Sequence, residues 1–98
     1  MNHSTQLQDK TSAVDLLLQE GLEYYRTNDF SKALETYTGA LKAAEREGDP
    51  ALLADIYYRM GRVHLRRQQW ELSIQVFGQA LTLLETSGTN ASKAIVHS

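Results

Sequence analysis

The chain has 98 residues, of which 42% are hydrophobic and 22% are charged, and this composition is typical of one folded globular domain rather than of a disordered segment. Its formal net charge of −2 supplies no basic excess, so we expect neither nucleic acid nor a membrane as a partner. The absence of cysteine excludes disulfides, thiolate zinc sites and cysteine nucleophiles.

The start of the chain is polar and lacks the apolar stretch of a secretory signal, and no later apolar run is long enough to span a bilayer. We therefore predict a flexible tail at residues 1–11 and a cytoplasmic protein.

Two helices are predicted in the first half of the chain, because apolar residues recur there at spacings of three and four. Thr11 or Ser12 can cap the first helix, Asn28-Asp29 interrupts it, and Asp29 can cap the second, which Gly48 ends as a left-handed cap. The first helix has Val14, Leu17, Leu18, Gly21, Leu22 and Tyr25 on its apolar side, and the second has Phe30, Ala33, Leu34, Tyr37, Ala40, Leu41 and Ala44.

Two more helices are predicted in the second half. Asp49-Pro50 begins the third with a capping Asp and a Pro at the first helical position, where its missing N–H costs nothing. It runs over about residues 50–67, and a fourth spans roughly residues 70–86. Short loops make successive helices antiparallel. We expect the third helix to face inward with Leu53, Ile56, Tyr57, Met60, Gly61, His64 and Leu65. The apolar residues of the fourth helix are Leu72, Ile74, Phe77, Ala80, Leu81 and Leu84.

The sequence repeats itself at an offset of 40 residues, which superposes Gly21 on Gly61. Between residues 12–48 and residues 52–88 the seven identical pairs are Asp15 with Asp55, Gly21 with Gly61, Arg26 with Arg66, Ala40 with Ala80, Leu41 with Leu81, Glu45 with Glu85, and Gly48 with Gly88. Small residues also recur at matching places, where we expect helices to meet closely: Gly21, Gly61, Ala33, Ser73, Ala40 and Ala80.

These residues resemble the tetratricopeptide repeat signature, W-x2-L-G-x2-Y followed by A-x3-F. The first unit has Leu17-x2-Glu20-Gly21-x2-Tyr24, Ala33-x3-Tyr37 and Ala40-Leu41, and the second has Tyr57-x2-Met60-Gly61-x2-His64, Ser73-x3-Phe77 and Ala80-Leu81. The resemblance implies an all-α chain of two tandem helix-turn-helix repeats, at residues 12–48 and 49–87, in a variant longer than the usual repeat of about 34 residues.

The family resemblance further implies a protein–protein interaction module, in which the first helices of each repeat line a groove that holds a peptide or partner protein. Carried onto this chain, the partner-binding residues are Asp15, Leu18, Leu22, Tyr25, Arg26, Asp55, Tyr58, Arg59, Arg62 and Arg66. The family's clamp for carboxylate tails needs Lys and Asn where this chain has Leu18 and Leu22, so that specific function is disfavoured.

Three arginines, Arg59, Arg62 and Arg66, form one stripe along the third predicted helix. Guanidinium groups suit carboxylates, so the stripe is a candidate anchor for an acidic partner segment. The alternative is a solvated helix face paired to nearby acids such as Asp55, four residues before Arg59.

Two pairs of tyrosines occupy matching positions. We expect Tyr24 and Tyr57 to lie in the core, whereas Tyr25 and Tyr58 could also stack on a ligand. His64 holds a packing position and is expected to be a hydrogen-bonded core residue rather than a metal ligand.

No phosphate loop, nucleophile elbow or metal-binding spacing is present in the sequence. We therefore expect no enzyme activity, no cofactor and no metal.

Two repeats leave one side of the array uncovered, because each repeat buries its faces only against its neighbours. Residues 88–98 are either a C-terminal tail or the start of a truncated third repeat. The uncovered side of the fourth helix, at Ile74, Phe77, Leu81 and Leu84, makes an oligomerisation module, a possible homodimer, the alternative function.

Overall fold

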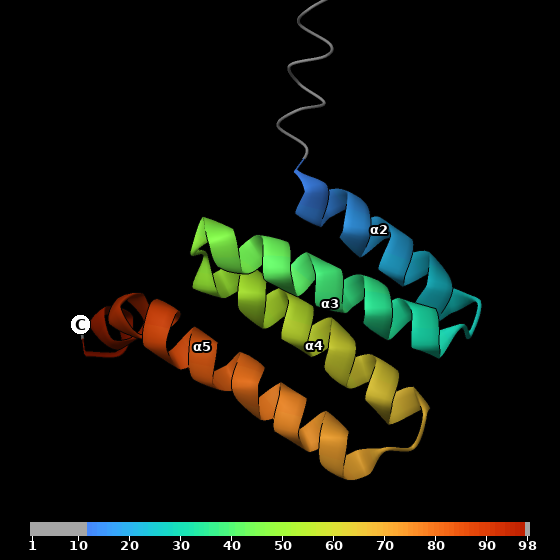
Figure 1. Ribbon diagram of the computed structural model, residues 1–98. Coiled ribbons are helices and arrows are strands. Elements are labelled where there is room, and N and C mark those ends of the chain that lie inside the picture. The colour runs from blue at the N-terminus through green and yellow to red at the C-terminus, as the bar shows by residue number, and fades with distance from the viewer. Residues whose placement is uncertain (1–11, 98) are drawn as a thin grey trace, which may run out of the picture.

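The computed structural model describes the backbone of residues 12–97 and the side chains of residues 12–86, and the predicted tail at residues 1–11 lies outside the described residues. The described part consists of four helices: α2 (Ala13–Arg26), α3 (Phe30–Glu47), α4 (Pro50–Arg66) and α5 (Trp70–His97). They lie side by side in chain order and alternate in direction (Figure 1). The predicted all-α fold is confirmed.

Three of the predicted helix boundaries are set by local capping. The Asp15 N–H donates to Ser12 Oγ at 3.2 Å, and the N–H groups of Ala51 and Leu52 donate to the Asp49 carboxylate at 3.1 and 3.4 Å. Gly48 adopts the left-handed conformation, with φ of 66°. Asp29 begins α3 as expected, but its side chain accepts no capping hydrogen bond, so that prediction was wrong in its mechanism.

The two helical hairpins, α2–α3 and α4–α5, share one turn geometry at an offset of 40 residues. Asn28 and Gln68 both adopt left-handed backbone conformations, with φ of 67° and 62°. The next N–H in each turn, of Asp29 or Gln69, donates back to the carbonyl of Tyr24 or His64, at 2.7 and 2.8 Å. The sequence repeat is therefore also a repeat of backbone structure.

Close helix contacts explain the two glycines inside helices. A Cβ added to Gly21 would lie 2.7 Å from Cδ1 of Tyr37, and one added to Gly61 would lie 2.6 Å from Cδ1 of Phe77. Each aromatic ring therefore lies directly on a glycine of the preceding helix. The other small residues expected at close contacts are buried as well, namely Ala33, Ala40, Ser73 and Ala80.

The core is one cluster that joins the two hairpins, and α4 contributes Ile56 and Val63 to it. Val63 and Ala54 are buried although they were not expected to face inward, and Leu65 is exposed although it was. Because α4 packs against α3 on one side and α5 on another, its buried arc is broader than one helical face. Leu65 lies beyond that arc, where no further helix covers α4.

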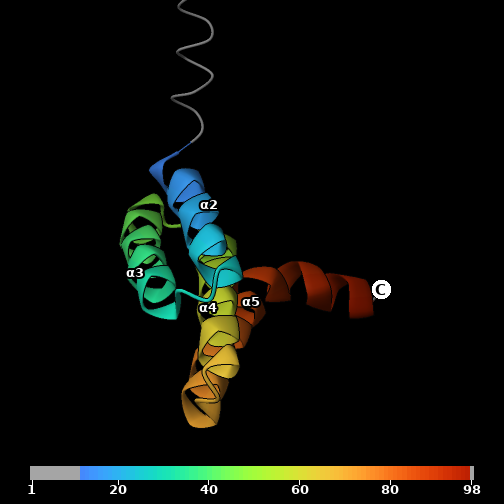
Figure 2. The ribbon, with the colours of Figure 1, turned by 90° about the vertical axis from the view of Figure 1, so that its right-hand side faces the viewer.

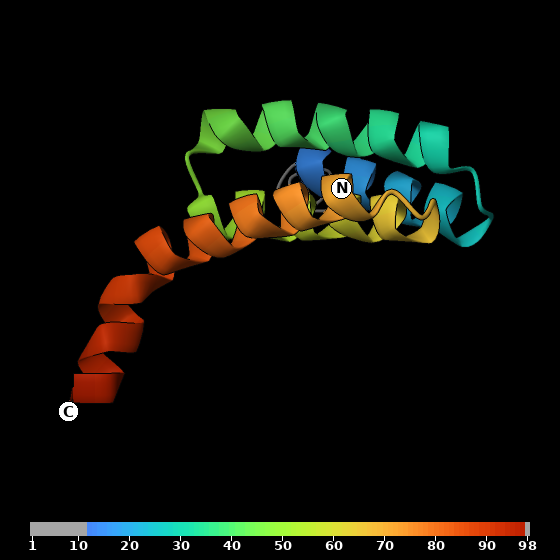
Figure 3. The ribbon, with the colours of Figure 1, turned by 90° about the horizontal axis from the view of Figure 1, so that it is seen from below.

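The last helix is longer than expected, since α5 continues past residue 86 to His97. Gly88 matches Gly48 in the repeat. After Gly48, Pro50 disfavours helical backbone at the residue before it, whereas the matching residue after Gly88 is Asn90, which imposes no such restriction. Nothing near Gly88 therefore forces the helix to end. The C-terminal part of α5 turns away from the other helices (Figures 2 and 3). The division into repeats at residues 12–48 and 49–87 stays a prediction.

The first helices of the two hairpins, α2 and α4, lie on the same side of α3 (Figure 2). Side chains of α2 and α4 can therefore form one continuous surface. None of the helices in the described part of the chain combines the length and the hydropathy needed to cross a membrane.

Candidate functional site

Two arginines of α4 lie over aromatic rings at the junction of the hairpins. The Arg62 guanidinium carbon is 5.0 Å from the centre of the Tyr25 ring and 5.9 Å from that of Tyr58. The Arg66 guanidinium carbon is 5.3 Å from the Tyr25 ring and 5.5 Å from the Phe30 ring. Because residues 58, 62 and 66 are four apart, helix geometry places them on one side of α4. We call Tyr25, Phe30, Tyr58, Arg62 and Arg66 the arginine–aromatic face.

Further contacts hold this face in place. Arg66 donates a hydrogen bond of 3.0 Å to the side-chain oxygen of Asn28, the left-handed residue in the α2–α3 turn. The rings of Tyr25 and Phe30 pack at 6.1 Å between their centres. Exposed cation–π contacts contribute about 0.5–1 kcal/mol each, so several of them together restrict how the guanidinium groups move.

The electrostatics of the face favour negative charge. Burial by itself raises the pKa of the Tyr25 hydroxyl, but hydrogen bonding and positive charge from Arg66 and Arg62 outweigh it and bring the pKa below its usual value of 10.0. A tyrosine that ionises more readily reports a positive local potential. The same potential would attract a carboxylate of a bound partner.

Arg59 behaves differently from the other two arginines of the stripe. It forms an ion pair with Asp55 at 3.3 Å and lines a crevice with Tyr37, whose pKa is raised by burial despite the opposing effect of Arg59. Arg62 and Arg66, by contrast, have no carboxylate within ion-pair distance among residues 12–86. Arg59 is thus paired internally, as the alternative interpretation predicted, whereas two guanidinium groups remain available.

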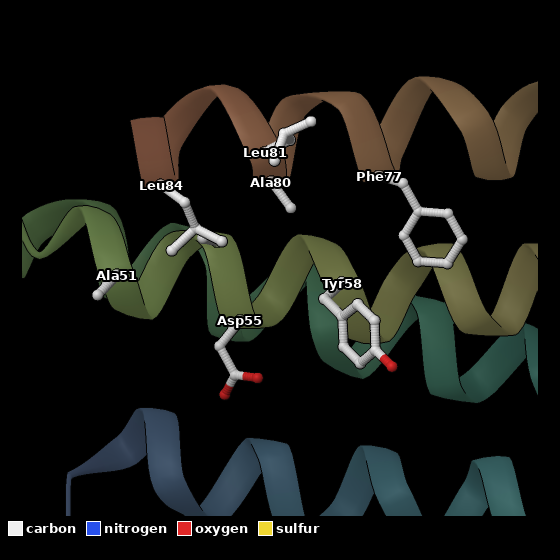
Figure 4. A pocket seen from close by; sticks show the side chains of 8 residues that line it. Ala51, Asp55, Tyr58, Phe77, Ala80, Leu81 and Leu84 are labelled. Atoms are coloured by element: carbon white, nitrogen blue, oxygen red, sulfur yellow. The ribbon is translucent and has the colours of Figure 1, made fainter. Parts of the chain in front are cut away.

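A second feature is an apolar groove between α4 and α5, with a cavity volume of about 520 Å³ (Figure 4). The rings of Tyr58 and Phe77 pack at 5.6 Å across it. Asp55 is its only charged lining residue within the described chain. The residues of this α4–α5 groove are Ala51, Ala54, Asp55, Tyr58, Phe77, Ala80, Leu81 and Leu84.

Comparison with protein families places the second hairpin in a known class. Residues 56–91, from within α4 to the later part of α5, match the model of the tetratricopeptide repeat. The match supports assigning this part of the chain, residues 56–91, to the tetratricopeptide repeat family. Comparisons with curated proteins and with solved structures gave no match. The family match agrees with the two glycine contacts, and tetratricopeptide repeats in general mediate protein–protein interaction.

The structure separates the residues expected to bind a partner. Leu18 is 7% exposed and belongs to the core, so its expected place in the groove was wrong: it packs with Tyr37 and Ile56, out of a partner's reach. Leu22 is half-buried and lines the crevice beside Arg59. The cavity volume of this crevice is about 10 Å³, which leaves room for roughly one water.

The remaining expected residues lie in two places. Asp15 and Arg26 are exposed on α2, where Arg26 forms an ion pair with Glu23 at 3.7 Å. Asp55 and Tyr58 line the α4–α5 groove, and Tyr58 belongs to the arginine–aromatic face as well. Tyr58 therefore joins the two surfaces.

The paired tyrosines and the histidine lie close to where the repeat pattern placed them. Tyr24 and Tyr57 are half-buried rather than fully enclosed, and the Lys32 ammonium is 5.7 Å from the Tyr24 ring. His64 Nδ1 and Gln69 Oε1 are 2.8 Å apart, which confirms a hydrogen-bonded histidine. Among the described residues no cluster of three or more potential metal ligands occurs.

Phe30 and Asn28 contribute to the face but were not among the expected site residues. From the sequence, Phe30 was predicted to be a core residue of the second helix, and Asn28 was interpreted as part of a helix interruption. Their contacts with Arg66 span more than 35 residues of sequence, so no local pattern could reveal them. The repeat register offered a partial signal, because it superposes Asn28 on Gln68, the other left-handed residue.

Proposed function

We propose that this chain is a non-catalytic protein-binding module whose arginine–aromatic face holds an acidic segment of a partner protein. The observation that carries the proposal is that Arg62 and Arg66 are stacked on aromatic rings yet lack a carboxylate partner within residues 12–86. Protein interaction is the general role of tetratricopeptide repeats. The acidic chemistry of the partner is inferred from the two guanidinium groups.

Stacking makes the arginines better ligands for a carboxylate. A guanidinium group that aromatic rings already restrict loses less conformational freedom when it binds. Its planar donors match both oxygens of a carboxylate. The Asn28 contact uses only one donor of Arg66, so others remain for a partner.

A short acidic peptide segment fits this face better than nucleic acid does. The whole chain has a formal net charge of −2, which repels an extended polyanion. Two neighbouring guanidinium groups can pair with two carboxylates of a peptide without requiring a long basic track.

Fluorescence anisotropy with a labelled glutamate-rich peptide tests the proposal, with the corresponding glutamine-rich peptide as reference. We expect Arg62→Ala and Arg66→Ala each to weaken binding of the acidic peptide at least about tenfold, since a lost charge-assisted hydrogen bond amounts to roughly 1.5–3 kcal/mol. Arg46→Ala, a matched change of an exposed arginine on α3, should leave the affinity unchanged.

Two results would refute the assignment. Equal binding of both peptides would show that carboxylates are not recognised, and an unchanged affinity in the double variant would place recognition elsewhere. A single-stranded RNA that binds more tightly than the acidic peptide, with a steep salt dependence, would instead indicate a nucleic-acid site.

The homodimer and the cytoplasmic location stay predictions. A dimer formed through the exposed apolar residues of α5 would bury Ile74 together with Leu81 and Leu84, which also line the α4–α5 groove. It would leave Arg62 and Arg66 accessible, so it is compatible with the proposed function.

A further inference from the structure

The α4–α5 groove has a counterpart in the first hairpin, 40 residues earlier in the chain. The repeat offset relates Tyr58 to Leu18 and Leu84 to Ala44. The described counterparts of the groove residues are Val14, Asp15, Leu18, Tyr37, Ala40, Leu41 and Ala44.

This counterpart surface is covered, whereas the groove is open. Leu18 is 7% exposed and Ala44 0%, but Tyr58 is 51% exposed and Leu84 48%. The difference comes from α4, which packs on α3 and adds Ile56 and Val63 to the cluster that contains Leu18 and Ala44. The first hairpin therefore shows what kind of element fills such a surface: one amphipathic helix.

We propose that the α4–α5 groove binds an amphipathic α-helix of a partner whose apolar side resembles that of α4. On α4, this side carries Leu52, Ile56, Met60 and Val63, at spacings of four, four and three residues. The partner helix presents aliphatic residues at the same spacings. This surface is separate from the arginine–aromatic face except for Tyr58, so the inference goes beyond the proposed function.

The chemistry of the groove favours an apolar occupant. Its one charged lining residue, Asp55, already has Arg59 as a partner at 3.3 Å. In the first hairpin Tyr37 lines one crevice with Arg59 of α4, which acts to lower the pKa of its hydroxyl, whereas the matching residue in the groove is Phe77, which has no hydroxyl. The occupying helix therefore needs no arginine at the position of Arg59.

A second copy of the chain, stacked head to tail, does not present such an apolar helix to the groove. The residues of α2 that match Met60 and Val63 of α4 are Glu20 and Glu23, and both are exposed. Stacking α2 of one copy on the groove of another would bury two carboxylates against apolar side chains, which is strongly unfavourable. The outer side of α2 thus carries two carboxylates beside the exposed Leu16, while the groove is open and apolar.

A labelled synthetic peptide comprising residues 49–67, which is α4 with its caps, is the probe for this proposal. We expect it to bind the full chain saturably and Leu84→Glu to weaken binding at least about tenfold, because a buried carboxylate opposes an apolar helix. Leu72→Glu, a matched change of an exposed leucine of α5 outside the groove, should bind the peptide like the unmodified chain. The same peptide with Met60→Glu and Val63→Glu, which copies the polar side of α2, should not bind.

Several outcomes would overturn the proposal. Binding that Leu84→Glu leaves unchanged would mean that the peptide replaces α4 in its own place rather than entering the groove. Absence of binding to a chain that melts cooperatively would also refute it. Sedimentation showing a dimer that Leu84→Glu dissociates would assign the groove to a second copy instead. The variant Arg62→Ala/Arg66→Ala should bind this peptide normally, so failure of the proposed function is distinguishable from failure of this one.

Discussion

The guanidinium carbon of Arg62 lies 5.0 Å from the centre of the Tyr25 ring, so the second hairpin reaches across the hairpin boundary to the first. The contact connects α4 with α2, which lie on the same side of α3 (Figure 2). It makes the geometry of the candidate site dependent on how the two hairpins stack.

The ionisation of Tyr25 measures this contact. Arg66 and Arg62 lower the pKa of its hydroxyl below 10.0, so an absorbance titration of the chain minus that of Tyr25→Phe should show a phenol that ionises below 10.0. Arg66→Gln should raise this pKa. Because the folded pKa is depressed, the associated gain in stability is present above the unfolded pKa of about 10 and is lost as the pH falls through the folded value. Ionisation of Tyr25 at or above 10.0 would contradict the described contact.

The two packed glycines should respond differently to alanine. Gly21→Ala should lower the free energy of unfolding by about 1–3 kcal/mol, because the buried Tyr37 ring has no room to move. Gly61→Ala should cost less, since Phe77 is only half-buried. Urea unfolding measures both.

The control for these variants is Gly78→Ala. Apart from its chain neighbours and the backbone of its own helix, a Cβ at Gly78 would meet nothing within 4 Å, so this change should stabilise the chain by about 0.5–1 kcal/mol through helix propensity. A destabilisation by Gly78→Ala as large as that by Gly21→Ala would show that packing against the rings is not the cause.

The left-handed Gln68 is a site for stabilisation. Its φ of 62° is unfavourable for a residue with a Cβ, by roughly 1–2 kcal/mol. Gln68→Gly should therefore raise the melting temperature, with part of the gain lost to the greater entropy of glycine in the unfolded chain. Gln75→Gly, on the exposed surface of α5, should lower it, as glycine costs about 1 kcal/mol inside a helix. A lower melting temperature for Gln68→Gly would contradict the turn geometry.

Two isoleucines compare the buried core with the outer side of α5. Ile56→Ala should reduce the free energy of unfolding by about 2–5 kcal/mol, because Ile56 is completely buried. Ile74 is 68% exposed, so Ile74→Ala should change it by no more than about 0.5 kcal/mol. Comparable losses in denaturant unfolding would mean that the outer side of α5 is covered in solution.

Features set by neighbouring residues were predictable from the sequence. Gly48 and Asp49-Pro50 mark a helix end and a helix start through their own backbone preferences, and the 40-residue register identified Gly21 and Gly61 as contact points. The all-α repeat fold follows from these local signals and their repetition.

Features that depend on packing between distant residues were not predictable. Leu18 and Tyr58 hold matching repeat positions, yet one is buried and the other exposed, because α4 covers only the first. Within the arginine stripe, Arg62 and Arg66 differ from Arg59 because they lie over the rings of Tyr25 and Phe30, which belong to other helices than α4. Periodicity along α4 carries no information about them.

Chemical-shift mapping with the acidic peptide tests the proposed function most directly. In a ¹⁵N-labelled chain, we expect the largest changes at the side-chain Nε–H groups of Arg62 and Arg66 and at the backbone of Tyr25. Changes centred on Leu81 and Leu84 with Arg62 and Arg66 unaffected, or no changes at saturating peptide, would contradict it.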